Sequence, residues 1–431
     1  MDTNTSEEPG QTWNCKQTMW KSRKQYPKNG ILMVSNDEEL VRSAEITWPT
    51  HPGLTLRLDP SRNSKTPSSN VSTEVIRDAT HRKATKSLWN TPRWGKTDGC
   101  KTLTVRSERD LPTTVYFEQG TPACVTGVLN PDWVDWLQGF PVGFSDPDSE
   151  TNAEQLEATI TPEHKVTCLD VFSGIGGIAR GLHPWCTTVG YCDVDPHARK
   201  VVGARQQDGS LDTAPMFDDI QTLTKATFQS ATGLDGCDML AGGFPCVGIS
   251  QAGNKEGLHN AKSSLYHHMV RLIDELNVKA VFLENVANIT SGKMHDALSV
   301  VLRSLTERGF VCRWVSLRAT NVGAPQTRNR WFLLATRNGL DFHDFQASPL
   351  THASIRERFF PHWASETSLP RQVDGAKLTK ASNAARKSRL QRLGNTVVPQ
   401  MVMAAFETLV AGMADVDAAR DSRASKRRRS S

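Results

Sequence analysis

The stretch Thr167-Cys-Leu-Asp-Val-Phe-Ser-Gly-Ile-Gly-Gly-Ile-Ala-Arg-Gly-Leu182 decides the fold of this chain. Its apolar run at 168–172 predicts a buried strand, and Gly174, Gly176 and Gly177 then allow the backbone to turn tightly. The apolar spacing after the turn predicts a helix. A strand, a glycine turn and a helix form the first unit of a doubly wound α/β fold, in which a ligand lies against bare backbone at the start of the helix.

An acidic residue further along the chain supports a nucleotide-type cofactor at this turn. Asp193 ends a second apolar run, 188–192, about 20 residues after the first glycine of the turn. A carboxylate at that position can accept hydrogen bonds from both hydroxyls of a ribose. The glycine turn is a weak signal by itself, and the acidic partner strengthens it.

Length and composition describe a soluble protein with room for two or three domains. The chain has 431 residues, of which 38% are hydrophobic and 23% are charged. Its net charge of +5 permits a nucleic-acid partner without requiring one. No run approaches the ~18 apolar residues of a membrane span, and the polar, acidic N-terminus does not resemble a signal peptide. Nine cysteines without a Cys-x-x-Cys pair disfavour a disulfide scaffold and a zinc site, and favour a reducing compartment.

Shifts in composition predict five consecutive parts of the chain. They are a basic flexible arm at 1–30, a smaller irregular β-rich module at 31–146, a linker at 147–165, a doubly wound α/β domain at 166–412 and a disordered basic tail at 413–431. Tryptophans interleaved with basic residues in the module suit a nucleic-acid surface, and equally a small module with buried tryptophans. The tail carries a basic cluster that suits nuclear import or a phosphate contact.

Local patterns place elements inside these parts. Short β-like runs are expected in the module at 31–34, 54–58, 103–105 and 113–117. The module closes on Asn130-Pro-Asp-Trp-Val-Asp-Trp-Leu-Gln-Gly-Phe-Pro-Val-Gly-Phe144, which predicts one short helix ended by glycine and proline. A last helix at 397–412 is apolar on most of its surface, so we expect it to pack on the α/β core.

A cysteine follows the third apolar run of the α/β part. In Asp238-Met-Leu-Ala-Gly-Gly-Phe-Pro-Cys-Val-Gly-Ile-Ser250 a predicted strand empties into two glycines, and Phe244-Pro245 delivers Cys246 at the carboxyl end of the strand. Open α/β sheets bind their ligands at that edge. A lone cysteine is ordinarily a small buried hydrophobe. In a proline-braced loop beside a cofactor site, we interpret it as a nucleophile.

Polar residues also end the next buried run. Glu284 and Asn285 close the apolar stretch 278–286, where they would be costly to bury unless they bond to something. This placement fits either a capping carboxylate or an acid that reaches a heteroaromatic substrate.

Three polar side chains precede the predicted strand at 331–335. Gln326, Arg328 and Arg330 alternate, so a period of two puts all three on one side of an extended segment. Such a set suits phosphate and carbonyl oxygens, with a plain surface set of ion pairs as the alternative.

Taken in order, these motifs resemble those of the cytosine-5 DNA methyltransferases. That family transfers a methyl group from S-adenosyl-L-methionine to carbon 5 of a flipped-out cytosine through a covalent cysteine adduct. The resemblance covers about 166–412 and rests on the motifs at 170–177, 244–246, 284–286, 326–330 and 394–397. It implies a Rossmann-like methyltransferase domain, double-stranded DNA as partner, and a monomer without metal or membrane attachment.

The family's residue roles carry over position by position as implications of the resemblance. Cys246 would be the nucleophile and Glu284 its partner on the cytosine ring, while Arg328 and Arg330 would support the flipped base. The residues implied to hold S-adenosyl-L-methionine are Phe172, Gly174, Gly176, Asp193, Asp219, Ile220, Gly243, Pro245, Leu265, Asn395 and Val397.

Two departures from the family pattern stand out. Val247 replaces the usual glutamine and cannot hydrogen-bond, which affects how the gap left by the flipped base is filled. The Leu-Gln-Gly-Phe-Pro phrase, normally placed between the two-arginine motif and Gly-Asn-Thr-Val, lies here at 137–141, upstream of the glycine turn. We therefore hypothesise that the target-recognition module has moved to the N-terminus, at about 31–146, and folds back across the DNA cleft.

Three other classes remain as alternatives. A transfer-RNA cytosine-5 methyltransferase shares the same core, although the tryptophan-rich module and the basic tail favour DNA in a nucleus. A non-catalytic DNA-binding relative is suggested by Val247, but the intact Cys246, Glu284 and both arginines argue against it. A dinucleotide-dependent dehydrogenase shares the glycine turn and Asp193, yet leaves Phe-Pro-Cys and Glu-Asn-Val unexplained.

Overall fold

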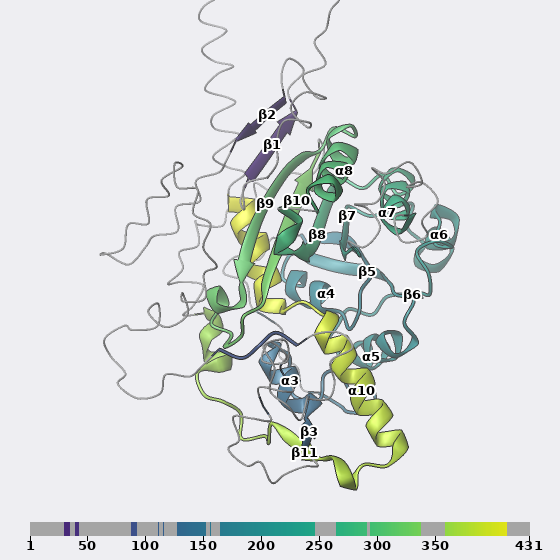
Figure 1. Cartoon of the computed structure of the whole chain (residues 1–431). Helices are drawn as coiled ribbons and strands as arrows, with labels where there is room; N and C mark the ends of the chain where they lie inside the picture. Colours follow the sequence, from purple (N-terminus) through teal and green to yellow (C-terminus); the bar gives the residue numbers. More distant parts are fainter. Residues whose placement is uncertain are drawn as a thin grey trace, which may run out of the picture.

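A central mixed sheet with helices on both faces organises the protein (Figure 1). The computed structural model describes residues 30–34, 39–42, 88–92, 111, 115, 127–151, 156, 164–245, 264–290, 294–337 and 358–411. Strands and helices alternate from residue 166 onward, so the predicted α/β class is confirmed.

Nine strands of the described part form one sheet, in the order β2-β1-β9-β10-β8-β7-β4-β5-β6. Neighbours from β8 to β6 pair in parallel, whereas β10, β9, β1 and β2 pair antiparallel. The strand first predicted from the sequence is β4, in the middle of the parallel part. The strands are β1 (Gly30–Val34), β2 (Glu39–Arg42), β4 (Val166–Val171), β5 (Cys186–Cys192), β6 (Met216–Phe217), β7 (Met239–Gly243), β8 (Ala280–Val286), β9 (Val311–Arg318) and β10 (Asn329–Thr336).

Helices cover both faces because alternate strand residues are apolar on each side. Phe282 and Phe332 point into one buried cluster, and Leu283 and Leu333 point into the other. The first cluster is covered by α4 (Gly177–Leu182), α5 (Pro196–Gln207) and the helix at 399–411. The second is covered by α6 (Lys225–Thr232), α7 (Ser264–Glu275) and α8 (His295–Thr306). The last helix predicted from the sequence is therefore confirmed, together with its packing on the core.

Two N-terminal strands extend the sheet beyond β9. Leu32 in β1 lies opposite Cys312 in β9, and β2 then pairs with β1. The run predicted at 31–34 is thus a strand, and it completes the hydrogen bonding of an otherwise open edge of the core. Val115 is helical, so the strand predicted at 113–117 is wrong at that residue. The runs predicted at 54–58 and 103–105 lie outside the described residues.

A smaller unit forms where residues before β4 meet residues after β10 (Figure 1). β3 (Gly127–Leu129) pairs antiparallel with β11 (Gln372–Asp374), and α3 (Pro131–Leu137) packs on α10 (Lys380–Asn395). The predicted short helix is α3, which begins as its sequence indicates, because the Asn130 side chain accepts from the backbone N–H of Asp132 at 3.1 Å. Short 3₁₀ helices connect other elements at Ala287–Thr290, Ala319–Val322, Phe360–Trp363 and Gly375–Lys377.

The segment predicted as a linker, 147–165, begins as packed structure. Thr151 is buried, its hydroxyl donates to Asp208 at 2.9 Å, and Arg205 donates to the same hydroxyl at 2.9 Å. The polar composition that indicated a linker instead provides partners for the buried guanidinium of Arg205. Residues 152–155 and 157–163 lie outside the described part.

No helix among the described residues is long and apolar enough to cross a membrane. The same part of the chain holds no group of three His, Cys, Asp or Glu side chains placed to bind a metal ion. The predicted arm up to residue 29 and the predicted tail at 413–431 lie outside the described residues.

Candidate active site

Most of the predicted site residues meet at one edge of the sheet. β5, β4, β7 and β8 are consecutive neighbours and run parallel, so their carboxyl ends lie side by side. Phe172, Asp193 and Pro245 follow three of these strands, and Glu284 lies near the end of the fourth. Ligands of open α/β sheets bind at such an edge.

Unusual backbone geometry shapes the turn after β4. Phe172, Gly174 and Gly176 have φ angles of 54°, 53° and 82°, all in the left-handed region. Glycine adopts this region without cost, whereas at Phe172 it stores strain. Ser173 holds the strained turn, because its hydroxyl donates to the carbonyl of Asp170 at 2.7 Å and accepts from the N–H of Cys192 at 3.0 Å. The turn is thereby tied to the end of β5.

Asp193 lies directly against this turn. Its Oδ2 accepts from the N–H of Gly174 at 2.8 Å, and its Oδ1 accepts from the N–H of Asp195 at 2.8 Å. Burial raises the pKa of Asp193, and the two backbone hydrogen bonds oppose that rise. A Cβ on Gly174 would find no atom within 4 Å, so the backbone there faces open space. Each carboxylate oxygen keeps a second lone pair that can accept a hydroxyl.

The residues implied to contact an adenine lie further along the same edge. Asp219 follows β6 and accepts from the N–H of Gln221 at 2.9 Å, and Ile220 is buried. Arg271 of α7 donates to the carbonyl of Ile220 at 3.0 Å, which fixes this loop against α7. Leu265, at the start of α7, packs partly buried against the same cluster.

The end of β7 is braced by the end of β8. Asn285 donates to the carbonyl of Phe244 at 3.0 Å. This hydrogen bond is the partner that the sequence required for a buried amide at the end of the strand. Gly243 pairs with Glu284, and a Cβ at residue 243 would lie 3.0 Å from Glu284 Oε2. Glycine there leaves room for the carboxylate. Residues 246–263 lie outside the described part of the chain, and they include the predicted nucleophile, Cys246, and the departure at Val247.

Glu284 forms an ion pair with Arg330. The Nε–Oε1 distance is 2.7 Å, and both side chains are mostly buried, with 15% of Arg330 and 13% of Glu284 exposed. The pair follows from register, because β10 places Arg330 opposite Val286 and Phe332 opposite Glu284. Residues two apart on a strand share a face, so the acid and the arginine are diagonal neighbours.

The other two members of the predicted polar trio point inward. Gln326 is fully buried and donates to the carbonyl of Leu137 at 2.7 Å. Arg328 is buried and donates to the carbonyl of Thr396. Gln326 does not face a ligand as expected, because its side-chain amide donates to the carbonyl of Leu137. The backbone is extended at this residue, since Gln326 forms a parallel β-bridge with Trp89.

Arg328 lies close to the ion pair. Burial lowers the pKa of Arg328 well below its usual value, the charge of Arg330 acts in the same direction, and the charge of Glu284 opposes both. Its Nε and Nη1 find no hydrogen-bond partner among the described residues. A buried guanidinium with two such nitrogens beside Glu284 retains donors for a further group.

The Leu-Gln-Gly-Phe-Pro phrase at 137–141 packs against segments that carry predicted site residues. Beyond its contact with Gln326, the Gln138 amide donates to the carbonyl of Leu393 at 2.8 Å. Gln400 donates to the carbonyl of Gly139 at 2.8 Å. The phrase therefore packs against the segment before β10 and against 393–400, although 255 residues separate Gln138 from Leu393 in the chain.

Two cofactor residues implied by the resemblance come from the end of α10 and the loop after it. Asn395 is exposed at the end of α10, and Val397 is buried. A Cβ on Gly177 would lie 3.1 Å from the carbonyl of Val397, so this loop lies directly against the first residue of α4. Val397 therefore lies close to the glycine turn.

Sequence reasoning missed Asp170 and Ser173 as site residues, although both lie inside the quoted stretch. Asp170 is fully buried below the turn, and burial raises its pKa to about 8. A charged residue in the middle of an apolar strand was the available signal for Asp170. Nothing in the local pattern marks Ser173, because its partners come from two different strands.

The family model described as C-5 cytosine-specific DNA methylase matches residues 166–395, more than half of the 431-residue chain. The chain therefore belongs to the C-5 cytosine-specific DNA methylase family. Its described elements place the glycine turn and Glu284 at one edge of one sheet.

Individual relatives share the same region. The chain is 33% identical over 245 residues to the type II methyltransferase M.CviJI of Paramecium bursaria Chlorella virus IL3A, covering 57% of this chain and 59% of that protein. It is 30% identical over 218 residues to M.MspI of Moraxella sp, covering 48% and 49%. It is 32% identical over 195 residues to the DNA (cytosine-5)-methyltransferase PliMCI of Paracentrotus lividus, covering 42% and 12%. The chain thus spans less than two thirds of the length of these relatives.

Solved structures also overlap with part of the chain. The Dnmt2 methyltransferase of S. pombe gives a TM-score of 0.38 at 14% identity, covering 58% of this chain and 99% of that one. The Entamoeba histolytica methyltransferase EhMeth gives a TM-score of 0.39 at 13% identity, covering 58% and 99%.

Proposed function

We propose that this protein is a DNA (cytosine-5) methyltransferase that uses S-adenosyl-L-methionine. One observation carries the proposal: β7 lies between β4 and β8, so the glycine turn with Asp193 and the Glu284–Arg330 pair flank the loop that leads to Cys246. A cofactor turn and a base-reading acid on either side of a nucleophile are the parts that methyl transfer to a pyrimidine ring requires.

The residues at the turn fit an adenosine-type cofactor. Asp193 keeps acceptor lone pairs beside the open backbone at Gly174, which suits the two ribose hydroxyls. The partly exposed Phe172, with Ile220 and Leu265 further along the edge, would contact the apolar faces of an adenine. Gly243, Pro245, Gly176, Asp219, Asn395 and Val397 would complete the pocket. When bound, S-adenosyl-L-methionine supplies an electrophilic methyl group.

The chain's own residues would prepare the cytosine. The thiolate of Cys246 adds to carbon 6, and the ring electrons that this addition displaces make carbon 5 nucleophilic. Glu284, hydrogen-bonded to the ring nitrogen and the amino group, favours the addition, and Arg330 holds the carboxylate in place at 2.7 Å. Loss of the carbon-5 hydrogen as a proton later returns an electron pair to the ring and expels the thiolate. Arg328 would support the base from below.

The proposed substrate is a cytosine in double-stranded DNA, turned out of the stack at a cost of a few kcal/mol. The N-terminal residues between β2 and β3, which supply tryptophans and basic side chains, would read the target. A monomer working in a nucleus completes the proposal, with the basic tail as its support.

Replacement of the nucleophile tests the function. Cys246→Ser should reduce transfer of labelled methyl groups to duplex DNA to background, because a serine hydroxyl is a far weaker nucleophile than a thiolate. Binding of S-adenosyl-L-homocysteine, measured by calorimetry, should be retained. Undiminished methyl transfer by the serine variant would contradict the proposal.

Two further readouts separate the alternatives. Trapping of the wild-type protein on duplex DNA that contains 5-fluorocytosine should give a covalent complex, and Cys246→Ser should give none. A protein that binds the duplex without trapping would be a non-catalytic relative. Methyl transfer to transfer RNA in preference to duplex DNA would identify the RNA enzyme.

A further inference from the structure

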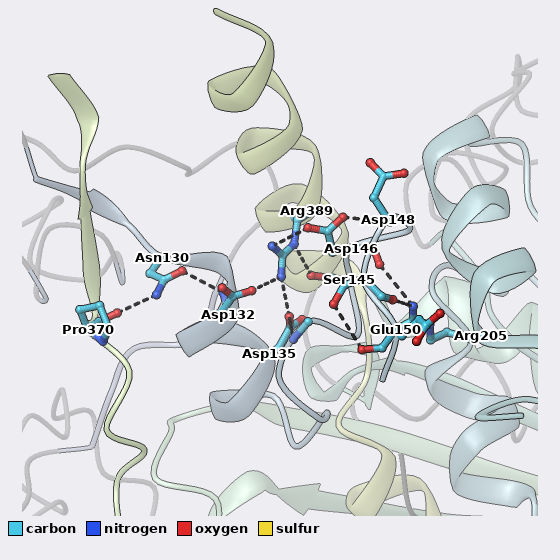
Figure 2. Close-up of polar contacts among 12 residues, drawn as sticks. Asn130, Asp132, Asp135, Ser145, Asp146, Asp148, Glu150, Arg205, Pro370 and Arg389 are labelled. Carbon is cyan, nitrogen blue, oxygen red and sulfur yellow. Dashed lines mark hydrogen bonds and ion pairs between the residues drawn. The ribbon is translucent and has the colours of Figure 1, made fainter. Parts of the chain in front are cut away.

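The N-terminal segment 127–151 is attached to the core by buried arginines. Figure 2 shows Arg389 of α10 in contact with Asp132, Asp135 and Asp146 from that segment. Its Nη2 lies 2.6 Å from Asp132 and 2.8 Å from Asp135, and its Nη1 lies 3.2 Å from Asp146. Asp135 is fully buried and Arg389 is 7% exposed. The pair of Arg389 with Asp135 is therefore desolvated, and such a pair is costly to break.

Phe144 of this docked segment contacts two helices of the core. Its ring is fully buried, and the guanidinium carbons of Arg180 and Arg205 lie over it, 5.6 Å and 5.4 Å from its centroid. Arg180 is 3% exposed and Arg205 is 1% exposed. A cation over an aromatic face is attracted more strongly when both are removed from water. One aromatic ring thus joins two helices that it does not belong to.

Both helices begin at the cofactor turns. Arg180 lies in α4, which starts directly after the glycine turn, and its backbone N–H donates to the carbonyl of Gly176 at 2.9 Å. Arg205 lies in α5, which starts three residues after Asp193, with Asp195 as its N-cap. The two turns meet in the 2.8 Å hydrogen bond between Gly174 and Asp193. A shift of α4 relative to α5 would change that contact.

The end of α10 adds a second connection to the same place. Arg392 lies one turn after Arg389 and pairs with Asp195 at 3.0 Å. α10 therefore contacts the docked segment through Arg389 and the start of α5 through Arg392. The docked segment, α10 and the Asp193 turn are linked by contiguous buried or half-buried contacts.

We propose that Phe144 is a positioning residue for the cofactor site: its ring, held by Arg180 and Arg205, fixes α4 against α5 and thereby makes cofactor affinity depend on the docked segment 127–151. The inference rests on the proposed cofactor. Phe144 would thus control the separation of Gly174 and Asp193. It lies upstream of the glycine turn and outside the region that the family model matches.

Phe144→Leu tests this role, with Phe310→Leu as the matched control. Phe310 is also fully buried and also lies under a guanidinium, that of Arg337 at 4.8 Å, but it packs between α8 and β9, away from the turns. Calorimetry with S-adenosyl-L-homocysteine should show Kd raised about fivefold or more by Phe144→Leu. Phe310→Leu should lower the melting temperature comparably and leave Kd unchanged within about twofold.

A double-mutant cycle tests whether Phe144 acts on the cofactor site through Arg180. Arg180→Met removes the cation and keeps a long buried side chain, so its effect on Kd should not add to that of Phe144→Leu. Pentafluorophenylalanine at position 144 keeps the ring shape and reverses its electrostatic face, so it should weaken cofactor binding even if the leucine variant does not fold. The KM for S-adenosyl-L-methionine should rise in these variants while the KM for DNA changes little.

The outcomes distinguish this inference from the proposed function. A wild-type protein that does not bind S-adenosyl-L-homocysteine would overturn the cofactor assignment, and this inference with it. Wild-type binding with an unchanged Kd in the Phe144 variants, or with equal changes in the Phe144 and Phe310 variants, would overturn the inference alone.

Discussion

At the scale of single residues, Asp170 is a buried acid directly before the glycine turn. Neither carboxyl oxygen reaches a partner with hydrogen-bond geometry among the described residues. Burial raises the pKa of Asp170 to about 8, the charge of Asp193 acts in the same direction, and only the backbone N–H of Ala179 opposes the shift. The raised pKa favours the neutral, protonated form of Asp170 in the folded protein, which avoids a second negative charge beside Asp193.

The raised pKa has a consequence for stability. The folded state binds the proton of Asp170 more tightly than the unfolded chain, so this group contributes stability that is full below the unfolded value of 3.8 and is lost as the pH rises to about 8. Asp170→Asn mimics the neutral acid. The free energy of unfolding of wild type, measured in urea between pH 4 and 8, should therefore fall relative to that of Asp170→Asn.

Asp235→Asn is the control for this measurement. It also removes one negative charge, but 79% of the Asp235 side chain is exposed. The difference in the free energy of unfolding between Asp235→Asn and wild type should stay nearly constant over the same pH range. If the difference between wild type and Asp170→Asn were equally constant, Asp170 would be charged in the folded state and this account of it would be wrong.

At the scale of elements, α10 is held to the core by charge as well as by apolar packing. Leu390 and Leu393 are buried, yet the helix also buries Arg386 and Arg389. Arg389 faces three carboxylates of segment 130–146. Burial raises the pKa of Asp135 to about 7, and the charge of Arg389 opposes that rise. The arginine therefore stabilises the charged form of a buried carboxyl group.

Arg389→Met should therefore cost far more than loss of an ordinary ion pair. Removing Arg389 leaves the buried Asp135 without its cation, so the carboxyl must either stay charged and unpaired or take up a proton. At pH 8 we expect a loss of about 3–5 kcal/mol in the free energy of unfolding. Arg308→Met is the matched control, since its pair with Asp274 at 2.8 Å is partly exposed and should cost at most about 1 kcal/mol. Equal losses in urea unfolding would show that Arg389 is no more than a surface contact.

At the scale of the whole molecule, residues before the glycine turn serve the fold. β1 pairs with β9 at the sheet edge, and Trp133, Leu137 and Phe140 are fully buried within the core cluster. Deleting 1–146 would remove these residues, so the loss of DNA binding by such a truncation would report unfolding and not recognition. A test of recognition has to leave β1, β2 and 127–151 in place.

Replacing residues 43–87 with a Gly/Ser linker of equal length meets that condition. We expect binding of S-adenosyl-L-homocysteine and the melting temperature to be retained, while preference among random duplexes, read by bisulfite sequencing, is lost. The matched control replaces 340–355, the region between the two-arginine motif and Gly-Asn-Thr-Val, and should keep the preference. The reverse result would place recognition there and contradict the N-terminal assignment.

The sequence alone determined the α/β core, the strand that carries the glycine turn, the short helix α3, the apolar last helix and the order of the motifs. Local signals predict each of these features: hydrophobic periodicity indicates the type of element and its apolar side, and glycine, proline and capping residues indicate where it ends. Only the tertiary structure decided that β1 completes the edge at β9, that Gln326 donates to Leu137 and that Arg389 clamps three carboxylates. Those partners lie between 189 and 284 residues apart in the chain, and a local pattern does not say which distant surface an element will meet.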